Sequence, residues 1–431
     1  MTTNRSITRR NLLKGAAAAG AAVAMPAIVP ASVFGANAPS NRIAMGFIGV
    51  GGHGAGHNLR GFLGQPDAQA VAVCDVDPNH VSRALNMVKG KYRSSFKGCQ
   101  TTSDWREIIA RRDVDAVMVS TPDHWHVPMS VAAAKAGKDV CCEKPTLTIA
   151  EGRILADTVK RCGTVYQTAT EDRSISIYHR MAELTRNGRI GKLRTIRVRL
   201  PAGPGKQVSA AAMPVPKGFD YDMWLGPAPW APYNRARCHW NFRWINDYSG
   251  GQLTDWGGHL IDMAQWGNDT ERTGPVEVDG KGVFPKEGLY NTATKYHIEY
   301  EYAGGVKMIV DSGGVDLRFE GDEGWVGNRG WRGRLQASSQ AILNSKIGPN
   351  GVHLFTCPAG EHRNFLDCVK TRMDPYFPAE IGHRCCTVMH IGNISMALGR
   401  KLRWDPDGER FANDNEANGM LSRAMREPWG L

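Results

Sequence analysis

Residues 42–58 read Arg-Ile-Ala-Met-Gly-Phe-Ile-Gly-Val-Gly-Gly-His-Gly-Ala-Gly-His-Asn. The apolar run Ile43–Ile48 is long enough for a buried strand, and it leads into glycines 49, 51 and 54, the G-x-G-x-x-G spacing of a dinucleotide site. In such a turn Gly49 permits the bend, Gly51 lets the backbone approach a pyrophosphate, and Gly54 lets the next helix pack close to the strand. The pyrophosphate would lie at the N-terminus of that helix, where free N–H groups and the helix dipole favour an anion. Taken alone, the spacing also fits a flexible glycine-rich turn.

A second apolar run supports the dinucleotide interpretation and indicates which cofactor is bound. Ala70–Cys74 ends in Asp75, about 20 residues after the glycines, where a carboxylate can accept the hydroxyl groups of the adenosine ribose. The same charge repels a 2′-phosphate, and the next residues, Val76-Asp77-Pro78, include no arginine. We therefore expect NAD rather than NADP.

The N-terminus has the pattern of an export signal. Thr8-Arg9-Arg10-Asn11-Leu12-Leu13-Lys14 is a twin-arginine motif, and the Ala-rich run Gly15–Ala24 follows it. This run is shorter than the roughly 20 residues of a membrane span. We expect residues 1–36 to be a signal peptide read by the twin-arginine export machinery, and the protein to be periplasmic or otherwise exported. Outside the cytoplasm there is no pool of free NAD, so the cofactor must be loaded before export and held tightly.

Composition limits the remaining possibilities. The chain of 431 residues is long enough for two domains with substantial cores. The formal net charge is +11, four cations belong to the signal, and no Lys/Arg-rich run stands out, so we expect no nucleic-acid partner. The ten cysteines contain no C-x-x-C pair, so they do not have zinc spacing, and folding before export favours free thiols.

Beyond Asp75 the alternation of strands and helices predicts a parallel, doubly wound α/β sheet. A helix is expected over 105–111, a strand over 116–120, a helix over 127–136 and a strand over 139–142. The turn 121–126 follows the strand at 116–120, at the sheet edge where ligands bind, and should border the nicotinamide. Its two histidines do not indicate a metal, because no further ligand set is evident, and no metal site is predicted.

At this point the chain resembles the Gfo/Idh/MocA oxidoreductases, which include glucose-fructose oxidoreductase and inositol dehydrogenase. The residues that carry the resemblance are the three glycines, Asp75, Thr121-Pro122 with His126, and Glu143-Lys144-Pro145. The resemblance implies that Lys144 faces the nicotinamide and the substrate, and that Thr121, His126 and Glu143 help to bind the cofactor. It covers roughly residues 42–406.

The resemblance also implies the domain organisation. We expect a Rossmann domain over 42–170, an α+β substrate domain with an open, mostly antiparallel sheet over 171–406, and a C-terminal extension over 407–431. Ile196, Val198 and Leu200 alternate with arginines, the period of a half-buried antiparallel strand. A homo-oligomer formed through the open face of this sheet is expected as well.

The predicted chemistry lies on one helix of the second domain. Asp255, His259 and Asp262 stand at i, i+4 and i+7 and therefore share a helix face. The spacing alone also fits an acid near the N-terminus of the helix and an i, i+4 pair of side chains that face solvent. The resemblance, however, implies that D-x-x-x-H carries the catalytic acid and base. Oxidation of a secondary alcohol needs a base, and a histidine suits that task. We expect His259 to be the base, Lys144 to donate a hydrogen bond to the same oxygen, and Asp255 to bind an adjacent hydroxyl or orient His259.

An aromatic-rich stretch before this helix indicates the substrate class. Tryptophans and tyrosines crowd between Phe219 and Gly250 together with arginines. Indole rings stack on the apolar faces of pyranoses and arginines bind hydroxyls, although packing in the core explains any one tryptophan equally well. We expect a sugar or cyclic polyol as substrate, bound in part by Arg243, Trp244 and Tyr248.

Three functions stay open on the sequence. The first is an exported oxidoreductase that transfers hydride between retained NAD and a secondary alcohol of a sugar or cyclic polyol, so that it oxidises one sugar and reduces another. The second is an NAD-dependent glycosidase of the same fold, in which transient ketone formation acidifies a C–H bond and allows elimination of the aglycone. The third, a non-catalytic NAD-bound sugar-binding protein, is disfavoured by the intact set Lys144, Asp255 and His259. The glycosidase subgroup departs from Glu-Lys-Pro, so Lys144 favours the first.

The twin-arginine motif predicts a simple export phenotype. Replacing Arg9 and Arg10 with lysines should leave the protein folded and in the cytoplasm, because the pair is read by a receptor and has no place in the fold. Cell fractionation followed by immunoblotting measures this. Unchanged export of the double variant would mean that another route carries the protein.

Overall fold

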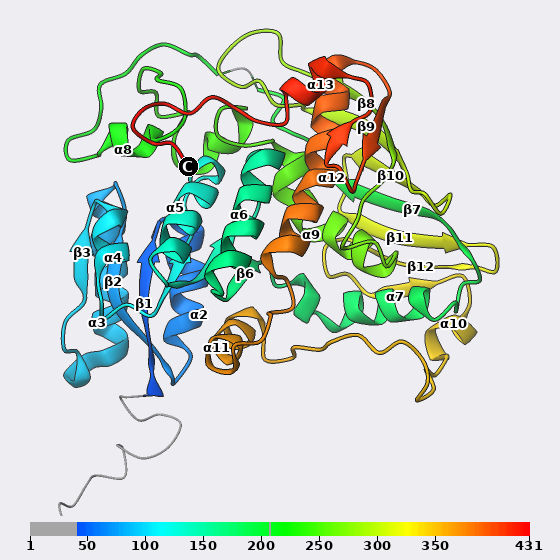
Figure 1. Ribbon diagram of the computed structural model, residues 1–431, viewed down its shortest axis with the longest axis horizontal. Coiled ribbons are helices and arrows are strands. Elements are labelled where there is room, and N and C mark those ends of the chain that lie inside the picture. Colours follow the sequence, from blue (N-terminus) through cyan, green and yellow to red (C-terminus); the bar gives the residue numbers. More distant parts are fainter. Residues whose placement is uncertain (1–40, 207) are drawn as a thin grey trace, which may run out of the picture. The chain divides into compact units, whose positions relative to one another are not determined.

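The computed structural model describes residues 41–206 and 208–431, and Ile43–Leu431 forms one compact unit (Figure 1). The predicted signal peptide, residues 1–36, lies outside the described residues. Within the described ranges, no helix combines the length and apolar character needed to cross a membrane.

The first half of this unit contains a six-stranded parallel sheet in the order β3-β2-β1-β4-β5-β6, which confirms the predicted doubly wound α/β fold. Its strands are β1 (Ile43–Ile48), β2 (Ala68–Cys74), β3 (Gln100–Thr102), β4 (Ala116–Val119), β5 (Asp139–Glu143) and β6 (Tyr166–Ala169). The helices between them are the π-helix η3 (Gly54–Leu59), α2 (Arg60–Leu63), α3 (Pro78–Tyr92), the 3₁₀ turn η4 (Arg93–Ser95), α4 (Trp105–Ala110), α5 (Asp123–Lys135) and α6 (Ile149–Cys162).

Local sequence explains why these elements begin and end where they do. β1 is apolar throughout and pairs on both sides, with β2 and β4, so it occupies the centre of the sheet. Asp77 caps α3 by accepting a hydrogen bond from the N–H of Asn79, and Thr148 caps α6 in the same way. Gly163 ends α6 in the left-handed conformation that glycine adopts without strain.

The second half contains a nine-stranded, mostly antiparallel sheet in the order β13-β12-β11-β7-β10-β9-β8-β14-β15, as expected. β7 carries the predicted alternation, with Ile196, Val198 and Leu200 buried and the intervening arginines exposed. The strands are β7 (Leu193–Leu200), β8 (Glu277–Val283), β9 (Lys295–Glu301), β10 (Lys307–Ser312), β11 (Asp316–Gly321), β12 (Trp325–Arg329), β13 (Leu335–Ala337), β14 (Leu402–Asp405) and β15 (Arg410–Phe411).

Helices cover one face of this sheet, and its other face is lined with charged side chains. α9 packs on β7 and β11, α12 on β8, and α7 on β12. On the exposed face, arginines 197 and 199 form ion pairs across strands with Glu320 and Asp316. The expected homo-oligomer through this face stays a prediction. The remaining helical elements are η5 (Asp172–Ser174), α7 (Ser176–Arg186), α8 (Tyr221–Leu225), η6 (His239–Trp244), α9 (Gln252–Gly267), α10 (Gln340–Asn344), α11 (Glu361–Thr371), α12 (Ala379–Leu398) and α13 (Asn415–Gly419).

Segments from the end of the chain return to the first sheet. α12 packs against both α6 and α9, so it lies between the two halves (Figure 1). Phe365 and Leu366 of α11 are buried in the same apolar cluster as β1. The segment 407–431, expected to be an extension, contributes β15 and α13, and its Trp429 ring packs 5.1 Å from that of Trp125 on α5. Early and late parts of the chain therefore build the first half together.

The link between α11 and the first half depends on Asp67. Its carboxylate accepts hydrogen bonds from Arg363 at 2.7 and 3.0 Å and contacts Lys370. Burial opposes the charge on Asp67, but Arg363 and Lys370 outweigh it and lower the pKa of Asp67 to about 2. Its contribution to stability is therefore present above the ordinary pKa of 3.8 and is lost as the pH falls towards about 2.

We expect Asp67→Asn to lower the free energy of unfolding by roughly 1–2 kcal/mol at neutral pH, because it removes the charge that Arg363 and Lys370 face. Urea melts at a series of pH values measure the effect. The difference between wild type and variant should shrink as the pH falls from about 5 to about 3. Asp113→Asn, which breaks an exposed pair with Arg111, is the control. A difference that does not change with pH would contradict the assignment.

Candidate functional site

A cavity of about 490 Å³ opens at the carboxyl ends of the parallel strands and is walled on its other side by α9 and the segment 219–243. Its size falls within the roughly 300–1,000 Å³ of small-molecule and cofactor sites. Residues from both halves of the unit line it, as the sequence predicts. The predicted site residues in the lining are Gly49, Gly51, Gly54, Asp75, Thr121, His126, Glu143, Lys144, Arg243, Asp255 and His259.

The glycine turn has the geometry that a pyrophosphate site requires. Gly49 has a φ of +80°, and a Cβ on Gly54 would lie 2.0 Å from the Gly49 carbonyl oxygen, so both positions demand glycine. A Cβ on Gly51 would meet only the His80 ring at 3.4 Å, so Gly51 leaves its side of the turn open to the cavity. The π-helix η3 starts directly after the turn. The residues present therefore fit a dinucleotide.

Asp75 follows β2 directly, and backbone N–H groups hold its carboxylate against the glycine turn. Its two carboxylate oxygens accept hydrogen bonds from the N–H groups of Val50 and Asp77, both at 2.9 Å. The His80 ring contacts the same carboxylate at 3.2 Å. Arg83, which the sequence analysis did not single out, also lines the cavity and donates to the Val50 carbonyl.

A buried ion pair brings Lys144 and Asp255 together from the two halves. Lys144 Nζ lies 2.7 Å from Asp255 Oδ1 and also donates to the Asp255 carbonyl, while Arg243 Nε donates to Oδ2 at 3.2 Å. Burial opposes both charges. The neighbouring cations nevertheless hold the pKa of Asp255 well below its usual range, and Asp255 and Glu143 raise the pKa of Lys144. Lys144 is therefore a cation and Asp255 an anion at neutral pH.

Small residues on α9 make this approach possible. A Cβ on Gly258 would lie 2.8 Å from Lys144 Cδ, and a Cβ on Gly257 would lie 2.5 Å from Met389 Sδ of α12. Adjacent glycines thus let the Lys144 side chain and α12 both pack closely against α9. No local sequence pattern predicts this role for them.

The backbone around Lys144 is fixed by buried groups. The His126 ring lies between the carbonyl oxygens of Thr121 and Pro145, at 2.8 and 2.7 Å. His390 on α12 donates to the Thr146 carbonyl at 2.7 Å, since a carbonyl can only accept. His126 therefore links the two loops that border the cavity, while α12 anchors the loop after β5 from the opposite side.

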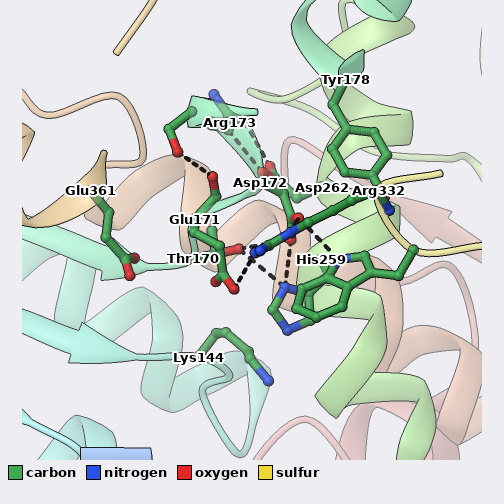
Figure 2. A network of polar contacts seen from close by, with 12 residues as sticks. Lys144, Thr170, Glu171, Asp172, Arg173, Tyr178, His259, Asp262, Arg332 and Glu361 are labelled. Atoms are coloured by element: carbon green, nitrogen blue, oxygen red, sulfur yellow. Dashed lines mark hydrogen bonds and ion pairs between the residues drawn. The ribbon is translucent and has the colours of Figure 1, made fainter. Parts of the chain in front are cut away.

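A carboxylate that the sequence analysis missed orients His259. His259 Nδ1 lies 2.6 Å from Asp172 Oδ2, across 87 residues of sequence. Asp172 is fully buried and lies beside His259 (Figure 2). Its other carboxylate oxygen accepts a hydrogen bond from Trp331 Nε1 at 3.0 Å. Burial opposes its charge, but His259 and Arg332 lower the pKa of Asp172. Asp172 lies three residues after the end of β6, so its position beyond the carboxyl end of a parallel strand is a signal that could have identified it.

This arrangement separates the roles of the two aspartates. Asp255, expected either to bind a hydroxyl or to orient His259, is engaged by Lys144 and Arg243, while Asp172 contacts the His259 ring. Asp262, the second acid on the helix face, points to Arg173 and forms a bidentate pair with it at 2.7 and 2.8 Å.

Two predicted substrate residues lie outside the cavity lining. Tyr248 is fully buried, and its hydroxyl accepts a hydrogen bond from Arg237, while Trp244 is buried in the same aromatic cluster. Neither side chain is among the residues that line the cavity, so their expected contact with substrate stays a prediction. From the same stretch, Trp224, Trp240 and Phe242 line it instead. The guanidinium of Arg243 lies 4.2 Å above the Trp240 ring.

Comparison with known proteins identifies the family. The sequence model described as "Oxidoreductase family, NAD-binding Rossmann fold" matches residues 43–170, and "Oxidoreductase family, C-terminal alpha/beta domain" matches residues 204–431. The chain belongs to the Gfo/Idh/MocA oxidoreductase family. Its first half is thus an NAD-binding domain, which confirms the predicted cofactor. A twin-arginine translocation signal matches residues 6–26 and confirms export, to the periplasm in bacteria.

Relatives of this Gfo/Idh/MocA protein carry two kinds of name. A glycosyl hydrolase family 109 protein of Shewanella baltica (strain OS185) is 33% identical over 174 residues, which are 36% of this chain and 38% of the relative. The match thus spans well under half of that protein. A WlbA dehydrogenase from Bordetella pertussis, solved with NADH and UDP-GlcNAcA, has a TM-score of 0.63 at 14% identity, covering 84% of this chain and 99% of its own.

A levoglucosan dehydrogenase solved with NADH and L-sorbose gives a TM-score of 0.61 at 19% identity, covering 84% of this chain and 98% of its own. At such identities the likeness to both dehydrogenases shows a shared fold.

The glycine turn yields a test of cofactor retention. Gly54→Ala should abolish co-purification of NAD, because its Cβ would collide with the Gly49 carbonyl and open the turn. Gly56→Ala is the matched control, since a Cβ there meets nothing within 4 Å. Denaturing the purified proteins and quantifying released nucleotide by chromatography measures retention. Equal NAD content in both variants would mean that the turn does not form the site.

Proposed function

We propose that this protein is an exported oxidoreductase that transfers hydride between tightly held NAD and a secondary alcohol of a sugar or cyclic polyol. The observation that carries the proposal is the convergence of Lys144 and the His259–Asp172 pair on the cavity that the glycine turn opens into. A hydrogen-bond donor and a base beside a dinucleotide site are what alcohol oxidation requires.

In this proposal His259 removes the hydroxyl proton. Because Asp172 engages Nδ1, the other ring nitrogen, Nε2, is left to accept the proton. The buried Asp172 carboxylate then stabilises the imidazolium that forms and keeps the ring in one orientation. NAD, when bound, supplies the hydride acceptor.

Lys144 acts on the same substrate oxygen. Its ammonium donates a hydrogen bond and stabilises the negative charge that develops as the proton leaves. Asp255 positions this ammonium through the 2.7 Å contact, and because its pKa lies well below the usual range it stays ionised and does not donate a proton. Asp255 is therefore a positioning residue, and Arg243 beside it offers further N–H donors to neighbouring hydroxyls.

Aromatic side chains support a sugar as the substrate. Trp240 is 65% exposed beside Arg243, and the Trp331 ring packs 5.5 Å from that of His259 and 5.2 Å from that of Trp256. Exposed indole faces near a catalytic histidine suit the apolar face of a pyranose. The sugar ligands in the two solved dehydrogenases of this fold agree with this class.

The relatives favour a second candidate, a glycoside hydrolase that uses the same groups. In that reaction oxidation to a ketone acidifies the adjacent C–H bond, the aglycone leaves by elimination, water adds, and the hydride returns to the sugar. No net oxidation occurs, so NAD is regenerated in each turnover. The observation behind it is the 33% identity to a glycosyl hydrolase family 109 protein.

The two candidates predict different products. Protein with its bound NAD should be incubated with matched panels of glycosides and free sugars, and the products analysed by mass spectrometry. A product two hydrogens lighter than the substrate supports the oxidoreductase. Release of aglycone with an unoxidised sugar supports the glycosidase, and neither product would contradict both.

Replacing the catalytic groups gives the sharpest test of either candidate. His259→Ala should slow the chemical step by roughly 10²–10⁴-fold with NAD still bound, and Lys144→Ala should cost roughly 3–4 kcal/mol in the same step. The double variant should lose less activation free energy than the sum of the two single losses, because both groups act on one oxygen. Single-turnover formation of NADH absorbance on adding sugar measures this. His297→Ala, on the exposed face of the second sheet, is the control, and wild-type rates in both catalytic variants would show the assignment to be wrong.

A further inference from the structure

A cluster of metal-ligating side chains lies outside the cavity lining. His57 projects from the π-helix η3, and Glu361 and His362 open α11. One candidate ligand atom from each of the three lies within 4.8 Å of the others. We propose that His57, Glu361 and His362 form a binding site for one divalent transition-metal ion of the zinc class.

Burial of unpartnered polar atoms supports the site independently. Glu361 is only 3% exposed, yet its Oε2 has no hydrogen-bond partner among the described residues. The same holds for His362 Nε2, which is also buried. Buried polar atoms nearly always have a partner, so two such atoms in adjacent residues of one cluster point to a ligand that engages both.

The donor set favours zinc over magnesium or calcium. Two imidazoles and one carboxylate form a known zinc set that leaves a fourth position for water, whereas magnesium and calcium prefer oxygen ligands throughout.

The supporting structure holds these side chains in place. His57 Nε2 and Glu361 Oε1 lie 2.6 Å apart, the contact of a shared proton that a metal would replace. The His362 ring lies over Gly61, where a Cβ would come within 2.5 Å of Nε2. Gln167 donates to the Glu361 carbonyl at 3.1 Å.

The site would join two parts of the chain that meet at the cofactor turn. His57 belongs to the helix that follows the glycine turn, and α11 comes from more than 300 residues later in the sequence. π-helical turns such as η3 occur frequently at functional sites. A metal here would therefore clamp the start of the cofactor helix to α11 and take no direct part in hydride transfer.

Two other groups of side chains in the described residues have candidate ligand atoms within the same distance of one another. In one group an arginine already pairs with the carboxylates, and in the other a histidine is exposed to solvent. In the group of Glu171, Asp172 and His259, Arg332 already pairs with both carboxylates. The group of Asp77, His80 and His239 includes an exposed histidine at the cavity rim. The second group supplies a matched histidine control.

The experiment is a metal titration of the purified, NAD-loaded protein after treatment with a chelator. Calorimetry with Zn²⁺ should show one equivalent bound, and Co²⁺ should give the intense visible bands of a four-coordinate ion. His57→Ala and Glu361→Gln should each weaken binding by at least about 100-fold, since loss of a direct ligand costs at least as much as loss of a supporting residue. His239→Ala and His297→Ala should bind as the wild type does.

His57 is partly exposed, so its variant should fold, and circular dichroism checks each protein. Absence of stoichiometric binding in the wild type would overturn the proposal. So would binding that His239→Ala removes and His57→Ala leaves intact. These readouts do not depend on turnover, so failure of the metal site and failure of the proposed reaction can be told apart.

Discussion

The buried ion pair between Lys144 and Asp255 is the contact on which the site depends. Lys144 follows β5 of the first sheet and Asp255 lies on α9 against the second, so the pair forms only when the two halves are closed on each other. Burying one such charge without the other typically costs roughly 3–5 kcal/mol. The pair therefore couples the position of the proposed donor to the packing of the whole unit, and the adjacent glycines of α9 make that packing possible.

The C-terminal part of the chain, which returns to the first half, also holds the residues of the site in place. α12 lies against α6 and α9, and its His390 fixes the loop that presents Lys144. The segment 219–243 covers the cavity, and the C-terminal tail is attached to it through the Arg426 N–H, which donates to the Pro227 carbonyl at 3.0 Å. A cavity with walls from both halves and a cover held by the C-terminal tail suits the predicted tight retention of the cofactor.

Much of the fold and of the candidate site could be predicted because the sequence patterns that indicate them are local. The strand, glycine turn and acid over residues 43–75 combine short-range periodicity with fixed spacing, and β7 shows a clean period of two. The strand β3 has three polar residues without a pattern, and its pairing with β2 defines it. The aromatic stretch 219–250 has no regular period, so sequence could not separate Trp240, which lines the cavity, from Tyr248, which is buried behind it.

The sequence by itself determined the fold class, the glycine turn, the export signal and most of the predicted residues that line the cavity, because each depends on residue types at fixed local spacing. Only the tertiary structure decided which carboxylate contacts which nitrogen-bearing side chain. Asp172 contacts His259 across 87 residues, while Asp255, four residues from His259, contacts Lys144. The tertiary structure also brought His57 to Glu361. The physical reason is that a buried hydrogen bond depends on direction and distance in space, and spacing along a helix places side chains on a face without settling which partner from another element meets them there.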